Sequence, residues 1–142
     1  MRYILFIALL FSCNLTFSQK YVAEYFEKYT PLAVGHERKY GIPASITLAQ
    51  AALESGYGRS RLARVNKNHF GIKSGSRYMI YSSAEYSFSH HARVLQSERY
   101  KLLFKLDISD YKGWAHGLYE CGYAQDSLYA KKLIFIIEKY IK

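Results

Sequence analysis

Glu54 is the side chain in this 142-residue chain whose surroundings best suit proton transfer, because it closes an alanine-rich stretch, AQAALES. A helix over residues 44–54 would carry an apolar stripe and a polar stripe on different faces. The apolar stripe is Ile46, Ala49 and Leu53, and the polar stripe is Thr47, Gln50 and Glu54. In the last helical turn, unpaired carbonyl groups and partial burial both disfavour a charged carboxylate, so its pKa should be raised. A carboxyl group that stays protonated near neutral pH can serve as a general acid.

Two glycines, Gly56 and Gly58, follow the acid and flank Tyr57. Gly56 is expected to adopt the left-handed conformation that ends many helices. Together the two glycines would keep bulk away and let a substrate approach the acid beside Tyr57. Spacing alone supports equally well a glutamate at a solvent-exposed helix end, so the acid role needs further support.

The spacing of apolar residues, and of glycine, proline and capping residues, predicts a mainly α chain of several short helices. Helices are expected over residues 21–29, 31–40, 43–55, 60–65, 82–96, 100–106, 110–121 and 126–141. Thr30 and Pro31 should separate the first two, as N-cap and first helical residue. Ser82 and Glu85 have the spacing of a capping box. Residues 66–80 lack helical periodicity and are expected to form a loop with one or two short strands.

Residues 1–18 have the features of a secretory signal peptide: a positive start, a short apolar run and small residues before Gln19. The apolar run is too short to span a bilayer comfortably as a folded helix. Two alternatives stay open, a lipoprotein acylated at Cys13 and an uncleaved anchor. Cleavage before Gln19 would leave one domain, residues 19–142, with Cys121 as its sole cysteine. Without an intrachain disulfide, that domain must be held together by packing.

The net charge of +9 is concentrated after the candidate acid. No acidic residue lies between Glu54 and Glu85, whereas this interval contains Arg59, Arg61, Arg64, Lys67, Lys73 and Arg77. A basic exported protein is expected to meet an anionic partner, such as a cell-wall polymer, lipopolysaccharide, a membrane surface or stray nucleic acid. General solubility is the plainer interpretation. We expect no metal and no cofactor, because no second histidine or carboxylate stands at clear metal-ligand spacing from His91.

Several blocks of the chain form an ordered series: YGIPAS at 40–45, LAQAALESGYG at 48–58, NHFGIK at 68–73, residues 81–95, WAHGL at 114–118 and GYAQDSLYA at 122–130. In order and spacing, these blocks resemble the glucosaminidase domain of bacterial peptidoglycan hydrolases, glycoside hydrolase family 73. The family includes flagellar rod-cap enzymes and many autolysins. The resemblance implies a lysozyme-like α-lobe for the domain that follows the signal peptide.

The resemblance also implies an enzyme that cleaves the β-1,4 bond after N-acetylglucosamine, with Glu54 as general acid. Its partner would be the glycan strands of peptidoglycan, with no nucleic acid and no specific protein partner. A monomer in the periplasm, the cell envelope or the extracellular space is expected. Tyr57, Asn68, Phe70 and Tyr123 become the candidate substrate-binding residues, since aromatic faces can stack on sugars. Phe70 could equally be a core ring.

Three other residues of the matching blocks are assigned to the fold rather than to the site. Trp114 is expected in the core, where tryptophan is usually highly buried. Asp126 is expected to cap a helix. His91 is expected to be a hydrogen-bonded structural residue.

The chain departs from the family where a second carboxylate is expected. Glycosidases commonly use two, and the family places the second on a β-hairpin arm after the Phe-Gly-Ile-Lys loop. Here only residues 74–76 separate Lys73 from Arg77, so we expect a minimal or absent β-lobe. Three functions therefore stay open: an active glucosaminidase, a lytic transglycosylase or muramidase that uses Glu54 alone, and a non-catalytic peptidoglycan-binding module. Glu85 is the nearest second carboxylate, but its spacing predicts a capping role.

Overall fold

The structure is a computed structural model that describes residues 2–142, with side chains from Gln19 onward. The order of its elements is α1 (Arg2–Tyr40), α2 (Ala44–Ser55), α3 (Arg61–Asn66), β1 (Lys73–Ser74), β2 (Arg77–Tyr78), α4 (Ala84–Leu95), the 3₁₀ helix η1 (Glu98–Lys105), α5 (Tyr111–Glu120), α6 (Tyr129–Ile136) and the π-helical turn η2 (Ile137–Ile141). The strands form one antiparallel hairpin that pairs Lys73 with Tyr78 and Ser74 with Arg77. The predicted mainly α fold with a minimal β-lobe is confirmed.

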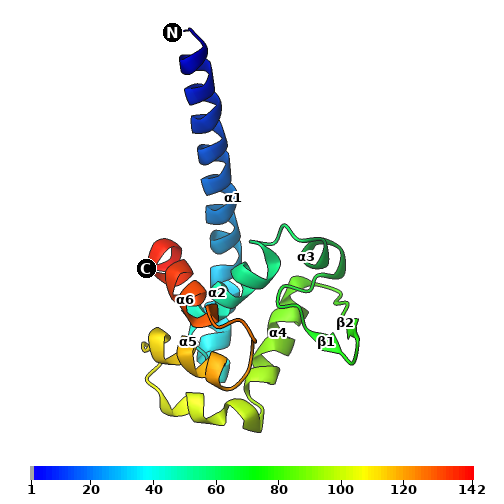
Figure 1. Cartoon of the computed structure of the whole chain (residues 1–142). Coiled ribbons are helices and arrows are strands. Elements are labelled where there is room, and N and C mark those ends of the chain that lie inside the picture. Colours follow the sequence, from blue (N-terminus) through cyan, green and yellow to red (C-terminus); the bar gives the residue numbers. More distant parts are fainter. Residues whose placement is uncertain (1) are drawn as a thin grey trace.

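Helix α2 lies at the centre of the molecule, packed against α1, α5 and α6 (Figure 1). Its alanines make this possible, because Ala49, Ala51 and Ala52 are fully buried and let neighbouring helices approach closely. Helices α5 and α6 pack on each other at one side, whereas α3 and the hairpin lie on the opposite side of α2. Trp114 on α5 is buried, as predicted.

The predicted break at Thr30 and Pro31 is wrong, because α1 continues through both residues. The Thr30 hydroxyl donates to the Phe26 carbonyl oxygen at 2.6 Å instead of capping a new helix. One face of this segment is packed into the core by Val22, Tyr25, Phe26, Tyr29 and Ala33. This packing outweighs the loss of one backbone donor at proline. The helix ends where predicted, at Gly41, whose φ is 70°.

The predicted signal peptide coincides with the first part of α1, whose side chains lie outside the described residues. Cleavage before Gln19 would therefore cut within α1, and it stays a prediction. Among the described residues, none of the helices combines the length and the apolar character needed to cross a membrane.

Helix α4 begins one residue later than the capping box predicts. Its N-cap is Ser83 rather than Ser82, and Glu85 lies in the first turn. The Glu85 carboxylate is hydrogen-bonded to the Ser83 side chain and to backbone N–H, which lowers its pKa. The predicted capping box is therefore not formed, because Ser83 makes no side-chain capping bond, and Glu85 is bonded instead to the Ser83 side chain and to its own backbone N–H.

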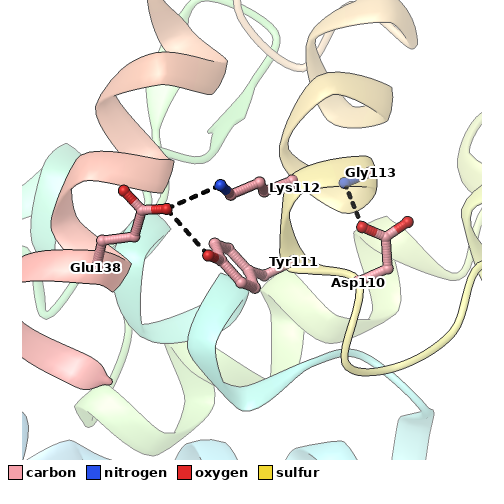
Figure 2. A network of polar contacts seen from close by, with 5 residues as sticks. All are labelled: Asp110, Tyr111, Lys112, Gly113 and Glu138. Atoms are coloured by element: carbon pink, nitrogen blue, oxygen red, sulfur yellow. Dashed lines mark hydrogen bonds and ion pairs between the residues drawn. The ribbon is translucent and has the colours of Figure 1, made fainter.

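Two carboxylates of the C-terminal region stabilise the packing of α5 (Figure 2). Glu138 on η2 accepts hydrogen bonds from Lys112 Nζ and from the Tyr111 hydroxyl, each at 3.0 Å. Asp110 caps α5 by accepting from the Gly113 backbone N–H at 2.9 Å. These acids are therefore engaged in holding the start of α5 and its contact with the C-terminal turn.

Candidate active site

Glu54 lies in the last turn of α2, directly before the Gly56 C-cap, whose φ is 56°. The residue as a whole is exposed, yet desolvation of its carboxyl group raises its pKa. A hydrogen bond with Tyr129 acts in the opposite direction, because it favours the carboxylate. The raised pKa matches the expectation from the sequence, and burial is its main cause.

Tyr129 connects Glu54 to a buried polar pair. Its hydroxyl oxygen lies 3.0 Å from Gln50 Nε2, and Gln50 Oε1 lies 3.0 Å from His91 Nε2. Tyr129 comes from α6, Gln50 from α2 and His91 from α4, so three helices contribute to one hydrogen-bonded chain. The sequence placed Gln50 on the polar stripe with Glu54, but it gave no sign that a tyrosine 79 residues away would join them.

Tyr123 lies at the same place, in the loop between α5 and α6. It is half-buried, and its ring stacks on Tyr129 with centroids 5.7 Å apart and contacts His91 at 6.1 Å. Burial raises its pKa well above the ordinary range, with smaller contributions from Tyr129 and Glu54. Tyr123 therefore shares an environment with Glu54.

Tyr57 also keeps an accessible surface, but its ring belongs to an aromatic cluster with Tyr21, Tyr25, Phe26 and Tyr140. Burial raises its pKa to about 12. The ring borders two hollows, one of about 640 Å³ beside α1 and α3 and one of about 500 Å³ beside α6. Glu54 is not part of the lining of either hollow, although Leu53 and Tyr57 line the second.

The glycines that flank Tyr57 differ in role. A Cβ on Gly56 would meet no atom within 4 Å, whereas one on Gly58 would lie 2.9 Å from the Tyr25 ring. Gly58 thus allows the close packing of Tyr25, and it also lines the larger of the two hollows.

Asn68 and Phe70 are placed beneath the surface. Asn68 is 1% exposed; its side-chain nitrogen donates to the Ile72 and Met79 carbonyl oxygens at 2.8 and 3.1 Å, and its oxygen accepts from Ile72 N–H at 3.1 Å. Phe70 is 4% exposed and stacks on His91 with ring centroids 3.9 Å apart. Asn68 therefore fixes the loop around the hairpin, and Phe70 covers one face of His91.

Two further carboxylates, Glu85 and Asp126, have other partners. Glu85 lies near Lys28 and His69 at the start of α4. Asp126 accepts from the Leu128 N–H at 2.9 Å and pairs with Lys132 at 2.5 Å. Among residues 19–142, no carboxylate contributes to the pKa shift of Glu54. The structure therefore brings Glu54 together with tyrosines rather than with a second acid.

The basic interval after Glu54 is exposed on α3, the hairpin and the adjoining loops. None of its six cationic side chains forms an ion pair with the carboxylates of residues 19–142. Lys73 lies over the Tyr78 ring at 4.6 Å, and Arg59 lies over the Tyr21 ring at 4.5 Å. In the described part of the chain, no group of three or more His, Cys, Asp or Glu residues could hold a metal ion.

A family model described as Glucosaminidase: Mannosyl-glycoprotein endo-beta-N-acetylglucosaminidase matches residues 30–142. The exo-glucosaminidase LytG of Bacillus subtilis is 32% identical, over 72% of this chain and 45% of that protein. The peptidoglycan hydrolase FlgJ of Pseudomonas aeruginosa is 29% identical, over 78% of this chain and 34% of that protein. The chain thus spans less than half the length of these curated relatives.

Solved structures of peptidoglycan-hydrolase domains also resemble this chain. The catalytic domain of the autolysin Auto from Listeria monocytogenes superposes with a TM-score of 0.76 at 27% identity, covering 84% of each chain. The glycoside hydrolase domain of Salmonella typhimurium FlgJ gives a TM-score of 0.70 at 26% identity, covering 83% of this chain and 87% of that domain.

Proposed function

Because this chain belongs to the glucosaminidase family, we propose that it is a peptidoglycan hydrolase that cleaves the β-1,4 bond after N-acetylglucosamine. The observation that carries the proposal is the environment of Glu54, a carboxyl group with a raised pKa and a tyrosine hydroxyl beside it. The relatives that are named as peptidoglycan hydrolases support the choice of substrate.

In the proposed reaction, protonated Glu54 donates its proton to the glycosidic oxygen as the bond to the sugar breaks. The carboxylate that forms accepts a hydrogen bond from Tyr129, which stabilises it. Water then attacks the sugar, assisted by the substrate's own acetamido group or positioned by Tyr123, and the proton that it releases returns to the Glu54 carboxylate. Such substrate assistance makes a second carboxylate unnecessary.

Substrate contacts in this proposal come mainly from exposed tyrosine surface. Tyr123 and Tyr57 are half-buried residues, and in this proposal a sugar stacks against them. Asn68 and Phe70 are buried and act indirectly in this proposal, because Asn68 holds the hairpin loop and Phe70 packs against His91. The exposed cations after Glu54 suit the anionic character of the cell wall.

A lytic transglycosylase or muramidase that uses Glu54 alone is the second candidate function. The same observation favours it, since no second carboxylate accompanies Glu54 in residues 19–142. The match over residues 30–142 favours the glucosaminidase.

We further propose that residues 1–18 are a signal peptide and that residues 19–142 act as a monomer outside the cytoplasm. Mass spectrometry of the secreted protein tests the signal peptide, and mass spectrometry of the sacculi that it digests tests the proposed cleavage. We expect an N-terminus at Gln19 and fragments with N-acetylglucosamine at the reducing end. An acylated Cys13 would contradict the signal peptide, and 1,6-anhydro-muramic ends or a lack of fragments would contradict the proposed cleavage.

A further inference from the structure

A buried chain of hydrogen bonds leads from the core to Glu54. It runs from His91 through Gln50 to Tyr129, with 3.0 Å between the hydrogen-bonded atoms at each step. Tyr129 in turn interacts with the Glu54 carboxyl group and lowers its pKa. The three residues behind Glu54 are 1%, 0% and 2% exposed. Buried polar groups of this kind need a complete set of partners, so the direction of each hydrogen bond matters.

The direction of these hydrogen bonds follows from one buried polar atom of His91 that has no hydrogen-bond partner. His91 Nδ1 is buried and has no hydrogen-bond partner among the described residues. A buried N–H without an acceptor is rarer in proteins than a buried acceptor without a donor. Nδ1 is therefore the bare nitrogen, and the proton of the neutral ring is on Nε2. Phe70, stacked on His91 with ring planes 11° apart, holds the ring in this orientation.

Each following bond is then determined. His91 Nε2–H donates to Gln50 Oε1, so the Gln50 amide group must present its N–H to the Tyr129 oxygen. The Tyr129 hydroxyl oxygen accepts this bond, and its own hydrogen is left to donate to Glu54. All of the donors in the chain thus point toward the acid.

We propose that Gln50 and His91 are positioning residues that set the direction of the Tyr129 hydroxyl, so that the proton of Glu54 stays available to the substrate. This inference rests on the proposed role of Glu54 as general acid. In the opposite direction, Gln50 Oε1 would accept from the Tyr129 hydroxyl, and protonated Glu54 would donate inward to the Tyr129 oxygen. The proton needed at the glycosidic oxygen would then be held in a hydrogen bond inside the protein.

The ionisable groups within this hydrogen-bonded chain, His91 and Tyr129, stay neutral where Glu54 titrates. Burial lowers the pKa of His91 to about 3, with smaller effects from His36 on α1 and His90 on α4. The tyrosines that face Glu54 or one another here have raised pKa values, chiefly because of burial; they are Tyr81, Tyr100, Tyr123 and Tyr129. A change in the titration of Glu54 therefore reports on the hydrogen bond from Tyr129.

The tautomer of His91 is the first test, and it uses the unaltered protein. Long-range proton–nitrogen NMR correlations distinguish a histidine protonated on Nε2 from one protonated on Nδ1. We expect neutral His91 with its proton on Nε2. A proton on Nδ1 would reverse the chain and overturn the proposal, whether or not any variant folds.

The second test compares His91→Leu, Tyr129→Phe, the double variant and Leu95→Ala. Leu95 is fully buried one turn further along α4 and has no polar side-chain atom that could join the hydrogen-bonded chain, so its variant controls for a core defect. The carboxyl carbon of Glu54 is followed by NMR over pH, and kcat/KM on soluble glycan is measured over the same range. Glu54→Gln identifies the carboxyl signal.

We expect the pKa of Glu54 to rise in His91→Leu, because the acid form gains an inward hydrogen bond, and also in Tyr129→Phe, because the carboxylate loses its donor. The alkaline limb of kcat/KM should move to higher pH in both. In His91→Leu the plateau should also fall by about tenfold, since an inward hydrogen bond must break before transfer. In the double variant, loss of His91 should raise the pKa no further than Tyr129→Phe alone.

The outcomes separate this inference from the proposed function. If the unaltered protein cleaves no glycan while the NMR results hold, the hydrogen-bonded chain stands and the acid role of Glu54 falls. If the protein is active but His91→Leu leaves the Glu54 titration where it is, or Leu95→Ala moves it equally, the positioning role of His91 and Gln50 is wrong.

Discussion

The two sides of the region around Glu54 are built in different ways. On the helical side, α2, α4 and α6 hold a buried polar chain that ends at the acid. On the other side, the hairpin at residues 73–78 is exposed along its whole length and carries Lys73 and Arg77. The difference indicates that the position of the acid is determined by the core. The hairpin supplies positive charge but no carboxylate.

The hairpin side depends on few contacts. Its strands are two residues each, and its loop is held largely by the Asn68 side chain. Two-stranded hairpins are marginally stable by themselves. The contact between Phe70 and His91 joins this side to the helical one. Changes to the two sides should therefore have separable effects, on chemistry for the helical side and on local order for the hairpin.

Glu54→Gln should have the largest effect, on turnover alone. The amide keeps the shape of the side chain but cannot donate the proton, so turnover should fall by roughly 10²–10⁴-fold. Activity is measured on purified sacculi, with circular dichroism to show that the variant is folded. A loss of only a few-fold would mean that the helical side does not hold the acid.

Asn68→Ala should act on stability before it acts on chemistry. The change leaves the Ile72 N–H without its side-chain acceptor and two carbonyl groups without their side-chain donor, because Asn68 bonds to all three. Burying such unpaired groups costs about 1–3 kcal/mol of unfolding free energy. Chemical unfolding measures the loss, and hydrogen exchange at the Ile72 amide locates it.

Asn66→Ala is the matched control, since Asn66 is half-buried at the end of α3 and lies two residues away. Its effect on unfolding should be smaller than that of Asn68→Ala. Equal effects would mean that the Asn68 side chain does not hold the hairpin. A loss of turnover as deep as that of Glu54→Gln in a folded Asn68→Ala protein would make the hairpin side part of the chemistry.

Local patterns predicted what depends on local structure. The limits of α2 follow from Pro43 and Gly56, and the structure agrees. The raised pKa of Glu54 was also predicted, and burial is its largest cause. The helix break predicted at Thr30 and Pro31 is wrong, because a helix with a well-packed face can continue through a proline.

The same local patterns could not predict the tertiary contacts. From the sequence, Asn68 is an ordinary polar loop residue. In the structure its side chain is buried and bonds to the backbone of the same loop. The link from His91 to Gln50 spans 41 residues, and the link from Gln50 to Tyr129 spans 79. No periodicity along the chain reports on partners at such separations.

Glu85→Gln should have the smallest effect and would sharpen the contrast between the two carboxylates. The Glu85 carboxylate is exposed and complements the start of α4, where its hydrogen bonds to Ser83 and to backbone N–H lower its pKa. Its loss should lower the unfolding free energy at pH 7 by about 0.5–1 kcal/mol, near the low end for helix caps. Turnover per folded molecule should be nearly unchanged, and the same holds for Asp126→Ala, which removes the ion pair with Lys132.

The stability effect at Glu85 should depend on pH in a defined direction. Because the pKa of the folded state is below the ordinary 4.5, the contribution of the carboxylate is present above 4.5 and is lost as the pH falls through the lowered value. Unfolding of the original protein and of Glu85→Gln is therefore compared at pH 7 and at a pH well below 4.5, where the difference should vanish. Turnover on sacculi is measured at a temperature where both proteins are folded. A folded Glu85→Gln or Asp126→Ala protein as inactive as Glu54→Gln would identify a second catalytic carboxylate, and a reaction resting on Glu54 alone would be excluded.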